Sequence, residues 1–423
     1  TQVDKIIKLI DKTPIKAFGS SMEPFLYDGD LVYFEKVKTK QININDILLI
    51  KKGQFFIHRV IYKNDRYFIT KGDHNLLSDG RIRPNQVLGK LNKIKRGGNF
   101  FKPEDIYSVQ SSFYLKEIIR IKKLFEKNKV EYVILKGLPL HFFFEGTHPK
   151  RFYADCDILI DKEFFLQVEK ILLSQGYKAV DFSLSQQHRS IRSKLSEHSY
   201  QKIIQGFPIN FDIHLKAVFM MTQLGHLEAL YPQKLIDQLS DEFIKTKKVV
   251  KINNEPFFIL NSKFLILYLA LHLFHHNFHG AFRYQFLDKV IRTDLDSRLR
   301  GNDKVSGWKI ITQKITEYHL ENFVYSVFLL LKKYYKTPLP RSFILTMKQW
   351  NNETMNRYSQ INIFDSEPRI LSGINRFRNL FFLSPNHLWR KILVFLNPEV
   401  IYALFFVLKK KLFYFLKAVL KNH

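Results

Sequence analysis

The sequence predicts a multidomain protein in which an N-terminal all-β domain precedes an α/β (α+β) domain with a helical C-terminal half. Three observations predict this fold class. The chain has 423 residues, enough for two or three domains. Residues 1–100 alternate short apolar runs with turn residues, which is typical of β-strands. From Ser108 helical and strand-like segments alternate, and beyond Asn261 the pattern is mostly helical.

The first domain is predicted over residues 1–100. Its clearest strands are Asp46–Lys51, Gln54–Tyr62 and Tyr67–Lys71. The polar segment Lys63–Arg66 predicts a hairpin turn between the last two strands. The segment Arg96–Asn99 contains two glycines and predicts a linker that closes the domain.

The second domain is predicted over residues 108–345. The expected helices and strands in its first half are a helix over 113–128, strands over 132–135 and 155–160, a helix over 162–176 and a strand over 208–214. The polar segment Asp294–Asp303 interrupts a helical region and predicts a surface loop insertion at about 292–306. A basic helical tail is predicted over 346–423.

Composition excludes several classes of protein. Hydrophobic residues make up 46% of the chain and aromatic residues 15%, so full-length disorder is excluded. The single Cys156 excludes an internal disulfide framework and a zinc site built on several cysteines. No apolar run reaches the ~18 residues of a spanning helix, and residues 1–13 lack the apolar region of a signal peptide. We therefore expect a cytoplasmic or peripheral membrane protein.

The net charge of +28 suits an anionic partner. A coding bias toward Lys, Ile and Asn explains the charge equally well. No helix-turn-helix, RRM or zinc-finger pattern occurs, so a nucleic-acid partner is not expected.

From about Trp389 bulky apolar residues and Lys alternate on a helical period. This tail is predicted either to lie on an anionic membrane surface or to dock on its own domain.

A serine, a histidine and two acids form the first candidate site. Ser21 lies in a Gly-containing turn, and its hydroxyl needs an adjacent base, for which His58 on a strand is suitable. Asp79 or Asp73 would then orient the imidazole. Judged by residue type alone, the same residues also fit a β domain with two Asp-Gly turns and a partly buried histidine.

The order of the motifs in this region resembles that of type I signal peptidases. The motifs are G-S-S-M-E-P at 19–24, D-G-D-L-V at 28–32, H-R-V at 58–60 and K-G-D-H-N at 71–75. The resemblance is to the endoplasmic-reticulum-type branch, in which His replaces the Lys base. It implies Ser21 as nucleophile, His58 as general base and Asp79 as the acid, with Asp73 close by. It also implies an oxyanion hole formed partly by the Ser21 amide, a peptide or precursor-protein substrate and no cofactor.

Paired carboxylates in the second domain form the second candidate site. Asp155 and Asp157 are two residues apart on a predicted strand, so their side chains share a face. A third carboxylate on a neighbouring strand would complete a pocket suited to Mg²⁺, which can bind nucleotide phosphates. Lys136 with Gly137, at a strand-to-helix turn, and Arg151 are the predicted phosphate-binding residues. A D-x-D pair alone is also typical of a solvated strand face.

The surrounding motifs resemble a poorly characterised bacterial nucleotidyltransferase-like family. They are L-K-G at 135–137, R-x-x-x-D-x-D-I-L-I at 151–160 and F-D-I-H at 211–214, and the resemblance spans about Phe113 to Tyr335. It implies that Asp155, Asp157 and Asp212 hold Mg²⁺ and that a nucleoside triphosphate binds. Our first hypothesis is a signal peptidase-like serine peptidase coupled to this domain. The alternative is a Mg²⁺-dependent nucleotidyltransferase whose peptidase-like domain only binds.

Four histidines follow a helical spacing of i, i+3, i+4 and i+7, at positions 272, 275, 276 and 279. A zinc site is one interpretation. The run contains no Cys or Glu at helical spacing, so we favour a polar helix face that lines a cleft or packs under the nucleotide site.

Overall fold

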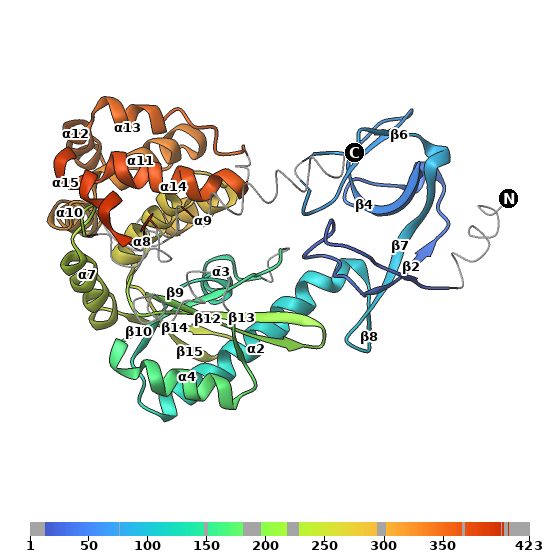
Figure 1. The fold of residues 1–423 in the computed structure, drawn as a ribbon, viewed down its shortest axis with the longest axis horizontal. Helices are drawn as coiled ribbons and strands as arrows, with labels where there is room; N and C mark the ends of the chain where they lie inside the picture. Colours follow the sequence, from blue (N-terminus) through green and yellow to red (C-terminus); the bar gives the residue numbers. More distant parts are fainter. Residues whose placement is uncertain are drawn as a thin grey trace. The chain divides into compact units, whose positions relative to one another are not determined.

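The computed structural model describes residues 13–75, 77–147, 151–180, 196–217, 228–293, 302–365, 369–398, 400, 401 and 405. The chain divides into two compact units, and Figure 1 follows it from end to end. The first unit comprises Thr1–Glu117, His148–Ala154 and Ile203–Ile209. The second comprises Ile118–Thr147, Asp155–Lys202 and Asn210–His423. A β-rich N-terminal region is therefore followed by a mixed α/β region, as the sequence predicts.

An antiparallel sheet of eight strands forms the first unit. Its strands are β1 (Ile15–Lys16), β2 (Leu31–Glu35), β3 (Ile47–Lys52), β4 (Gln54–Lys63), β5 (Phe68–Lys71), β6 (Arg81–Ile82), β7 (Val87–Arg96) and β8 (Asn99–Phe101). They are arranged in the order β1-β2-β7-β3-β4-β5-β6, with β8 paired to β7. Short 3₁₀ helices occur at η1 (Thr39–Gln41), η2 (Pro84–Gln86) and η3 (Pro103–Asp105). The three predicted strands are confirmed as β3, β4 and β5.

The linker predicted at Arg96–Asn99 is wrong. Arg96 ends β7 and Asn99 begins β8, and the two residues pair across the turn. Gly97 and Gly98 have φ angles of +54° and +84°. Two consecutive left-handed residues make a tight hairpin turn whose twist matches the flanking strands, so this glycine pair joins two strands instead of ending the domain.

A buried ion pair ties the first unit together. The Arg96 guanidinium donates to both carboxylate oxygens of Asp30, with a shortest distance of 2.6 Å, and both side chains are buried. Arg96 also donates to the carbonyl oxygen of Phe25 at 2.8 Å. Its guanidinium lies 4.4 Å from the ring centroid of Tyr27 and 4.7 Å from that of Phe207. Burying this charge is tolerable only because Asp30 and the carbonyl neutralise and solvate it.

A seven-stranded mixed sheet forms the base of the second unit. Its strands are β9 (Tyr132–Lys136), β10 (Cys156–Ile160), β11 (Lys178–Val180), β12 (Glu197–Ile204), β13 (Phe207–His214), β14 (Lys248–Ile252) and β15 (Glu255–Ile259). The order is β11-β12-β13-β10-β9-β15-β14, with β10 parallel to β13 and antiparallel to β9. The predicted strands over 132–135, 155–160 and 208–214 are confirmed as β9, β10 and β13.

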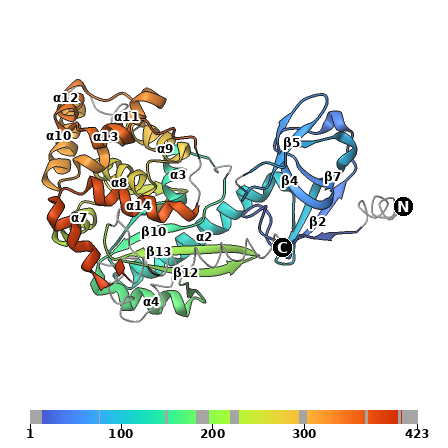
Figure 2. The same cartoon turned by 45° about the horizontal axis from the view of Figure 1, so that its top comes forward.

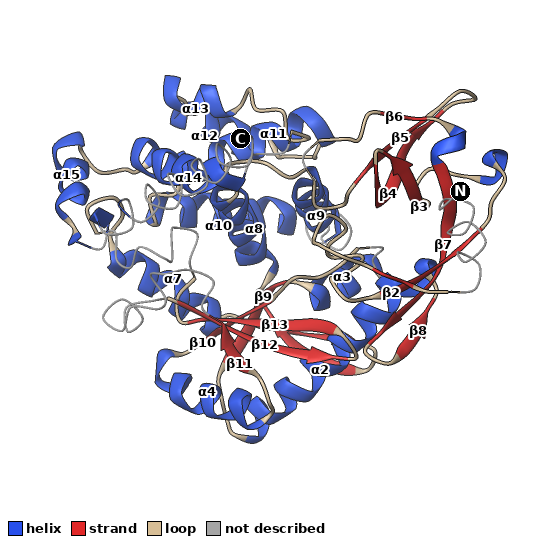
Figure 3. Ribbon diagram, turned by 45° about the vertical axis from the view of Figure 1, so that its right-hand side comes forward, coloured by secondary structure: helices blue, strands red, loops and turns tan. Residues whose placement is uncertain are grey.

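Helices cover the faces of this sheet and build most of the C-terminal half of the chain. They are α2 (Ile106–Lys127), α3 (Leu138–Glu145), η4 (Lys162–Phe164), α4 (Phe165–Ser174), α7 (Gln233–Lys245), α8 (Ser262–His275), α9 (Ala281–Ile291), α10 (Asn302–Glu317), α11 (Glu321–Tyr335), α12 (Arg341–Trp350), α13 (Glu353–Tyr358), α14 (Arg369–Leu383), α15 (Leu388–Ile392) and η7 (Leu393–Leu396). Figures 1 and 2 show α4 on one face of the sheet and α8 on the other. Figure 3 shows the predominance of helix in the C-terminal half. Residues 264–271 of helix α8 are all buried, which explains the apolar run in this part of the helix.

Several sequence predictions fall on residues outside the described ranges. Residues 1–12, residues 294–301 of the predicted loop insertion, and residues 402–404 and 406–423 of the predicted tail all lie there. Asn302 and Asp303, which were expected in that loop, begin helix α10. Among the described helices, none combines the length and the apolar character needed to cross a membrane. The described tail exposes Leu388, Trp389 and Leu396, and its contact with an anionic membrane stays a prediction.

We expect loss of the Arg96–Asp30 ion pair to destabilise the β-rich first unit. Asp30→Asn leaves the buried Arg96 charge without its counterion, which typically costs ~3–5 kcal/mol. All tryptophans lie in the second unit, at Trp308, Trp350 and Trp389. We therefore expect calorimetry to show a lower melting temperature for the β-rich unit, with an unchanged transition in tryptophan fluorescence. The exposed Asp65→Asn is the control, and an equal melting temperature for both variants would contradict the assignment.

Candidate functional site

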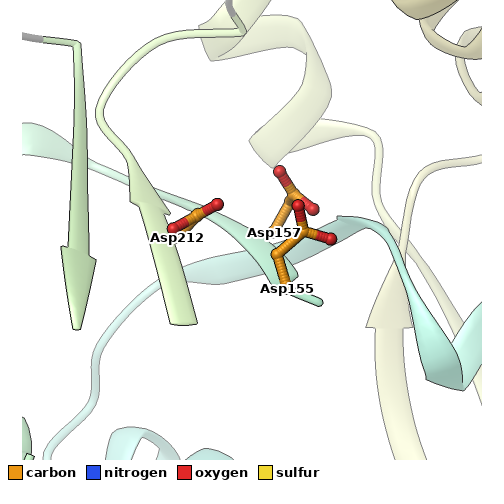
Figure 4. Close-up of side chains that lie close together, drawn as sticks. All are labelled: Asp155, Asp157 and Asp212. Atoms are coloured by element: carbon orange, nitrogen blue, oxygen red, sulfur yellow. The ribbon is translucent and has the colours of Figure 1, made fainter. Parts of the chain in front are cut away.

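Three strands bring the acidic residues of the second unit together. On β10, Asp157 pairs with Asp212 of the parallel strand β13 and with Lys136 of the antiparallel strand β9. Asp155 directly precedes β10 and lies two residues before Asp157. The carboxylate oxygens of Asp155, Asp157 and Asp212 lie within 4.8 Å of one another. Figure 4 shows the Asp212 carboxylate directed toward the other two from the neighbouring strand.

Asp157 is the buried centre of this acidic site. Its Oδ2 lies 2.5 Å from Lys136 Nζ, and its Oδ1 accepts a hydrogen bond of 2.9 Å from His214 Nε2. Lys136 Nζ also lies 3.5 Å from Asp155 Oδ2. At the other side Ser199 Oγ donates to Asp212 Oδ1 at 2.6 Å. Lys136, which was predicted to bind phosphate, is thus engaged by the carboxylates themselves.

The pKa values in the acidic site reflect crowding of negative charge. Burial, followed by the charges of Asp157 and Glu197, raises the pKa of Asp212 to about 8. Burial alone would raise the pKa of Asp157, but Lys136 and His214 outweigh it and lower that pKa. For the basic Lys136, burial alone would instead lower the pKa. The charges of Asp155 and Asp157 outweigh burial and hold the pKa of Lys136 well above its usual range. The site therefore favours a cation, and Lys136 supplies one.

The residues of the acidic site fit a magnesium ion. All three clustered side chains offer carboxylate oxygens, which are the ligands that Mg²⁺ prefers. Among the described residues, this is the one group of three or more acidic, His or Cys side chains arranged as metal ligands. Asp157 has both oxygens engaged by Lys136 and His214. A metal at this carboxylate and the Lys136 ammonium therefore compete for the same negative charge.

The strand-to-helix turn after Lys136 passes close to the backbone of Asp155 and Cys156. Gly137 is the N-cap residue of α3 and has a φ of +108°, which favours glycine. A Cβ at this position would lie 3.3 Å from the Asp155 carbonyl oxygen, so the turn passes close to β10.

Arg151 belongs to the first compact unit, where its guanidinium lies 4.8 Å from the Tyr153 ring centroid. Its contact with phosphate stays a prediction.

The histidine cluster does not form the continuous helical face that its spacing predicts. Helix α8 ends at His275, and Asn277 and Phe278 have positive φ angles that turn the chain before His279. His272 Nε2 and His276 Nε2 lie 3.1 Å apart. Burial, followed by the charge of His276, lowers the pKa of His272 well below its usual range. The pair is therefore neutral near pH 7, and the zinc interpretation has no group of described ligands to support it.

In the first unit, Ser21, His58 and Asp79 are hydrogen-bonded in series. His58 Nε2 lies 3.1 Å from Ser21 Oγ, and His58 Nδ1 lies 2.7 Å from Asp79 Oδ2. His58 is buried on β4, and Ser21 is half-buried in the turn that follows Gly19. With its proton on Nδ1, His58 donates to Asp79 and accepts from the serine hydroxyl. This is the geometry in which a histidine can deprotonate a serine.

The loop that follows β5 holds this series in place. The His74 amide donates to the Ser21 carbonyl oxygen at 2.9 Å. A Cβ on Gly72 would lie 2.5 Å from that carbonyl oxygen and 2.9 Å from His58 Nε2, so only glycine permits this approach. Asp73, which was predicted close to the catalytic acid, instead binds the Arg59 guanidinium through two hydrogen bonds of 2.7 and 2.8 Å. Asp73 therefore anchors the loop and is not placed on the imidazole.

Three residues of these sites were not predicted as site members. Thr70 Oγ1 donates to Asp79 Oδ2 at 2.7 Å, and Ser199 and His214 hold the acidic site. His214 carries a signal in the sequence, since it lies two residues after Asp212 on one strand and shares its face. Ser199 lies on another strand, and nothing in its local sequence indicates the contact.

Comparison with known proteins adds one match. A family model described as an uncharacterised nucleotidyltransferase matches residues 104–336, which is more than half of the 423-residue chain. This range confirms the predicted resemblance over about 113–335 and includes the whole acidic site. It begins after Ser21, His58 and Asp79. No curated protein and no solved structure matches the chain significantly.

We expect the Lys136 ammonium and a divalent cation to compete for the Asp157 carboxylate. Lys136→Met removes an ammonium 2.5 Å from the Asp157 carboxylate, so a divalent cation meets less repulsion. We expect electron paramagnetic resonance to show Mn²⁺ binding about tenfold tighter or more without nucleotide, since charges at this range interact by several kcal/mol. Lys162→Met, an exposed lysine on η4, is the control. Unchanged or weaker Mn²⁺ binding in Lys136→Met would show that Lys136 does not compete with the metal.

Proposed function

The chain belongs to the uncharacterised nucleotidyltransferase family, and from this premise we propose that it transfers a nucleotidyl group from a nucleoside triphosphate with Mg²⁺. The assembly of Asp155, Asp157 and Asp212 around one point carries this proposal. The peptidase was the first hypothesis from the sequence, but the family match favours the alternative. Only the nucleotidyltransferase-like region has a family match to support it.

The three carboxylates would hold Mg²⁺, which when bound neutralises phosphate oxygens and stabilises charge in the transferring group. Around them this chain's residues have separate tasks. His214 donates to Asp157 and Ser199 donates to Asp212, so each carboxylate keeps one orientation. Lys136 lies at the end of β9 beside the partly exposed Asp155, where its ammonium can pass from carboxylate to phosphate.

Helix α3 adds a second source of positive potential. It begins with Leu138 and Pro139 directly after Gly137, so in its first turn the amide N–H groups of Leu138 and Leu140 are the donors, because proline has none. Unpaired amides and the helix dipole favour an anion at such an N-terminus. The triphosphate is therefore expected between the three carboxylates and the start of α3.

Transfer of labelled phosphate tests the proposal. We expect ³²P from an α-labelled nucleoside triphosphate, but not from a γ-labelled one, to reach an acceptor when Mg²⁺ and cell extract are supplied. Asp157→Asn should lower this transfer at least a hundredfold, because a neutral amide removes charge from the centre of the metal site. Asp161→Asn, which changes a capping residue of η4, is the matched control. Label from the γ-position would indicate phosphoryl transfer instead and would contradict the proposal.

A second candidate function is peptide hydrolysis by the first unit. The hydrogen-bonded series Ser21–His58–Asp79 supports it. In this reaction Ser21 Oγ attacks the carbonyl carbon while His58 Nε2 takes the hydroxyl proton, which it later gives to the leaving amine. Asp79 stabilises the imidazolium through Nδ1–H, and Thr70 keeps Asp79 oriented. The Ser21 amide stays the predicted oxyanion donor.

An acylating probe of the penem class tests the second candidate. We expect covalent labelling of the wild type, and loss of at least a hundredfold in Ser21→Ala and His58→Ala. Asp79→Asn should slow labelling by about 10²–10⁴-fold, because the imidazole loses the partner that fixes its tautomer. Ser20→Ala removes the adjacent exposed serine and serves as the control. Labelling that persists in Ser21→Ala would show that another residue reacts.

A further inference from the structure

A basic cavity lies in the first unit beside the turn between β4 and β5. Its volume is about 830 Å³, which is in the range of ligand sites in proteins. We define the basic cavity by its charged and aromatic lining, which consists of Lys52, Asp65, Arg66, Tyr67, Arg81 and Arg83. Four of these six residues are cationic and one is acidic. The cavity therefore favours an anionic ligand with more than one charge.

Among the described residues, no carboxylate forms an ion pair with the cations of the basic cavity. Lys52 Nζ donates to the carbonyl oxygens of Asp79 at 2.7 Å and Arg81 at 3.4 Å, but a carbonyl carries no net charge. The Arg81 guanidinium lies 4.9 Å from the Tyr67 ring centroid. Within the described part of the chain, no ion pair engages the side chains of Arg66, Arg81 or Arg83.

The other arginines of the same sheet behave differently. Arg59 binds the Asp73 carboxylate through two hydrogen bonds, and Arg96 binds the Asp30 carboxylate through three. Guanidinium groups form planar forks that match carboxylates in this way. The three exposed arginines of the basic cavity present the same fork with no carboxylate from the described chain. A ligand that supplies several carboxylates would complete the pattern.

The position of the basic cavity indicates which ligand supplies them. Lys52 holds the carbonyl oxygen of Asp79, whose side chain binds His58. Arg81, two residues after Asp79, begins β6 and lines the cavity. The cavity therefore borders the loop that carries the acid of the Ser21–His58–Asp79 series. A peptide that extends from Ser21 along this loop would supply such carboxylates.

We propose that the basic cavity binds an acidic segment, rich in Asp or Glu, of a peptide that the first unit recognises. The proposal that this peptide is also cleaved rests on the second candidate function, whereas binding does not. Binding is therefore measured on the full chain carrying Ser21→Ala, which separates recognition from hydrolysis.

Fluorescence anisotropy with a fluorescein-labelled hexaglutamate peptide tests the inference, with a labelled hexalysine peptide as the probe control. In the Ser21→Ala background we expect Arg66→Gln with Arg83→Gln to weaken hexaglutamate binding at least tenfold. Lys38→Gln with Lys102→Gln removes the same two charges at exposed positions outside the cavity, and should weaken it less than twofold. Equal melting temperatures of the two double variants show that both are folded.

Three outcomes would overturn the inference. Equal weakening in both double variants would show attraction to net charge instead of a site. Absence of hexaglutamate binding would exclude the acidic segment, and displacement of the peptide by micromolar inorganic triphosphate would assign the cavity to a small phosphate ligand. A wild type that penem does not label, together with hexaglutamate binding by Ser21→Ala, would reject peptide hydrolysis and still support the binding site.

Discussion

The pairing of β10 with its two neighbours is the constraint on which the proposed nucleotidyltransferase site depends. This register places Asp157 between Lys136 and Asp212, with His214 two residues farther along β13. A buried carboxylate of this kind persists only if cations or donors satisfy it. Asp157 therefore needs Lys136 and His214 in the structure described. Its availability to a metal depends on whether another anion takes Lys136 away.

In the proposed function, this dependence would link metal binding to nucleotide binding. The negative charge of a triphosphate would attract the Lys136 ammonium away from Asp157, and the freed carboxylate would then be available to the accompanying Mg²⁺. Each step makes the other more favourable, so metal and nucleotide are expected to bind cooperatively. Ser199 and His214 keep the carboxylates oriented throughout, because neither has to move.

The sequence predicts the β-rich and α/β order of the fold, the strands β3, β4, β5, β9, β10 and β13, and part of each site. Apolar periodicity locates β3, β4, β9, β10 and β13, and a spacing of two places Asp155 and Asp157 on one face. Contacts that depend on register or loop path are not encoded locally. Asp73 belongs to the K-G-D-H-N motif at 71–75, between His58 and Asp79 in the sequence, yet the loop directs its side chain to Arg59. Lys136 is a plausible phosphate ligand by position, but its pairing with Asp157 follows only from the register of β9.

Diffraction from crystals grown with Mn²⁺ and a non-hydrolysable nucleoside triphosphate tests most directly whether the three carboxylates bind metal. The proposed nucleotidyltransferase function predicts an anomalous peak bonded to oxygens of Asp155, Asp157 and Asp212. It also predicts that Lys136 Nζ has moved from Asp157 to a phosphate oxygen. A bound nucleotide with no metal at these carboxylates, and with Lys136 still paired to Asp157, would contradict it.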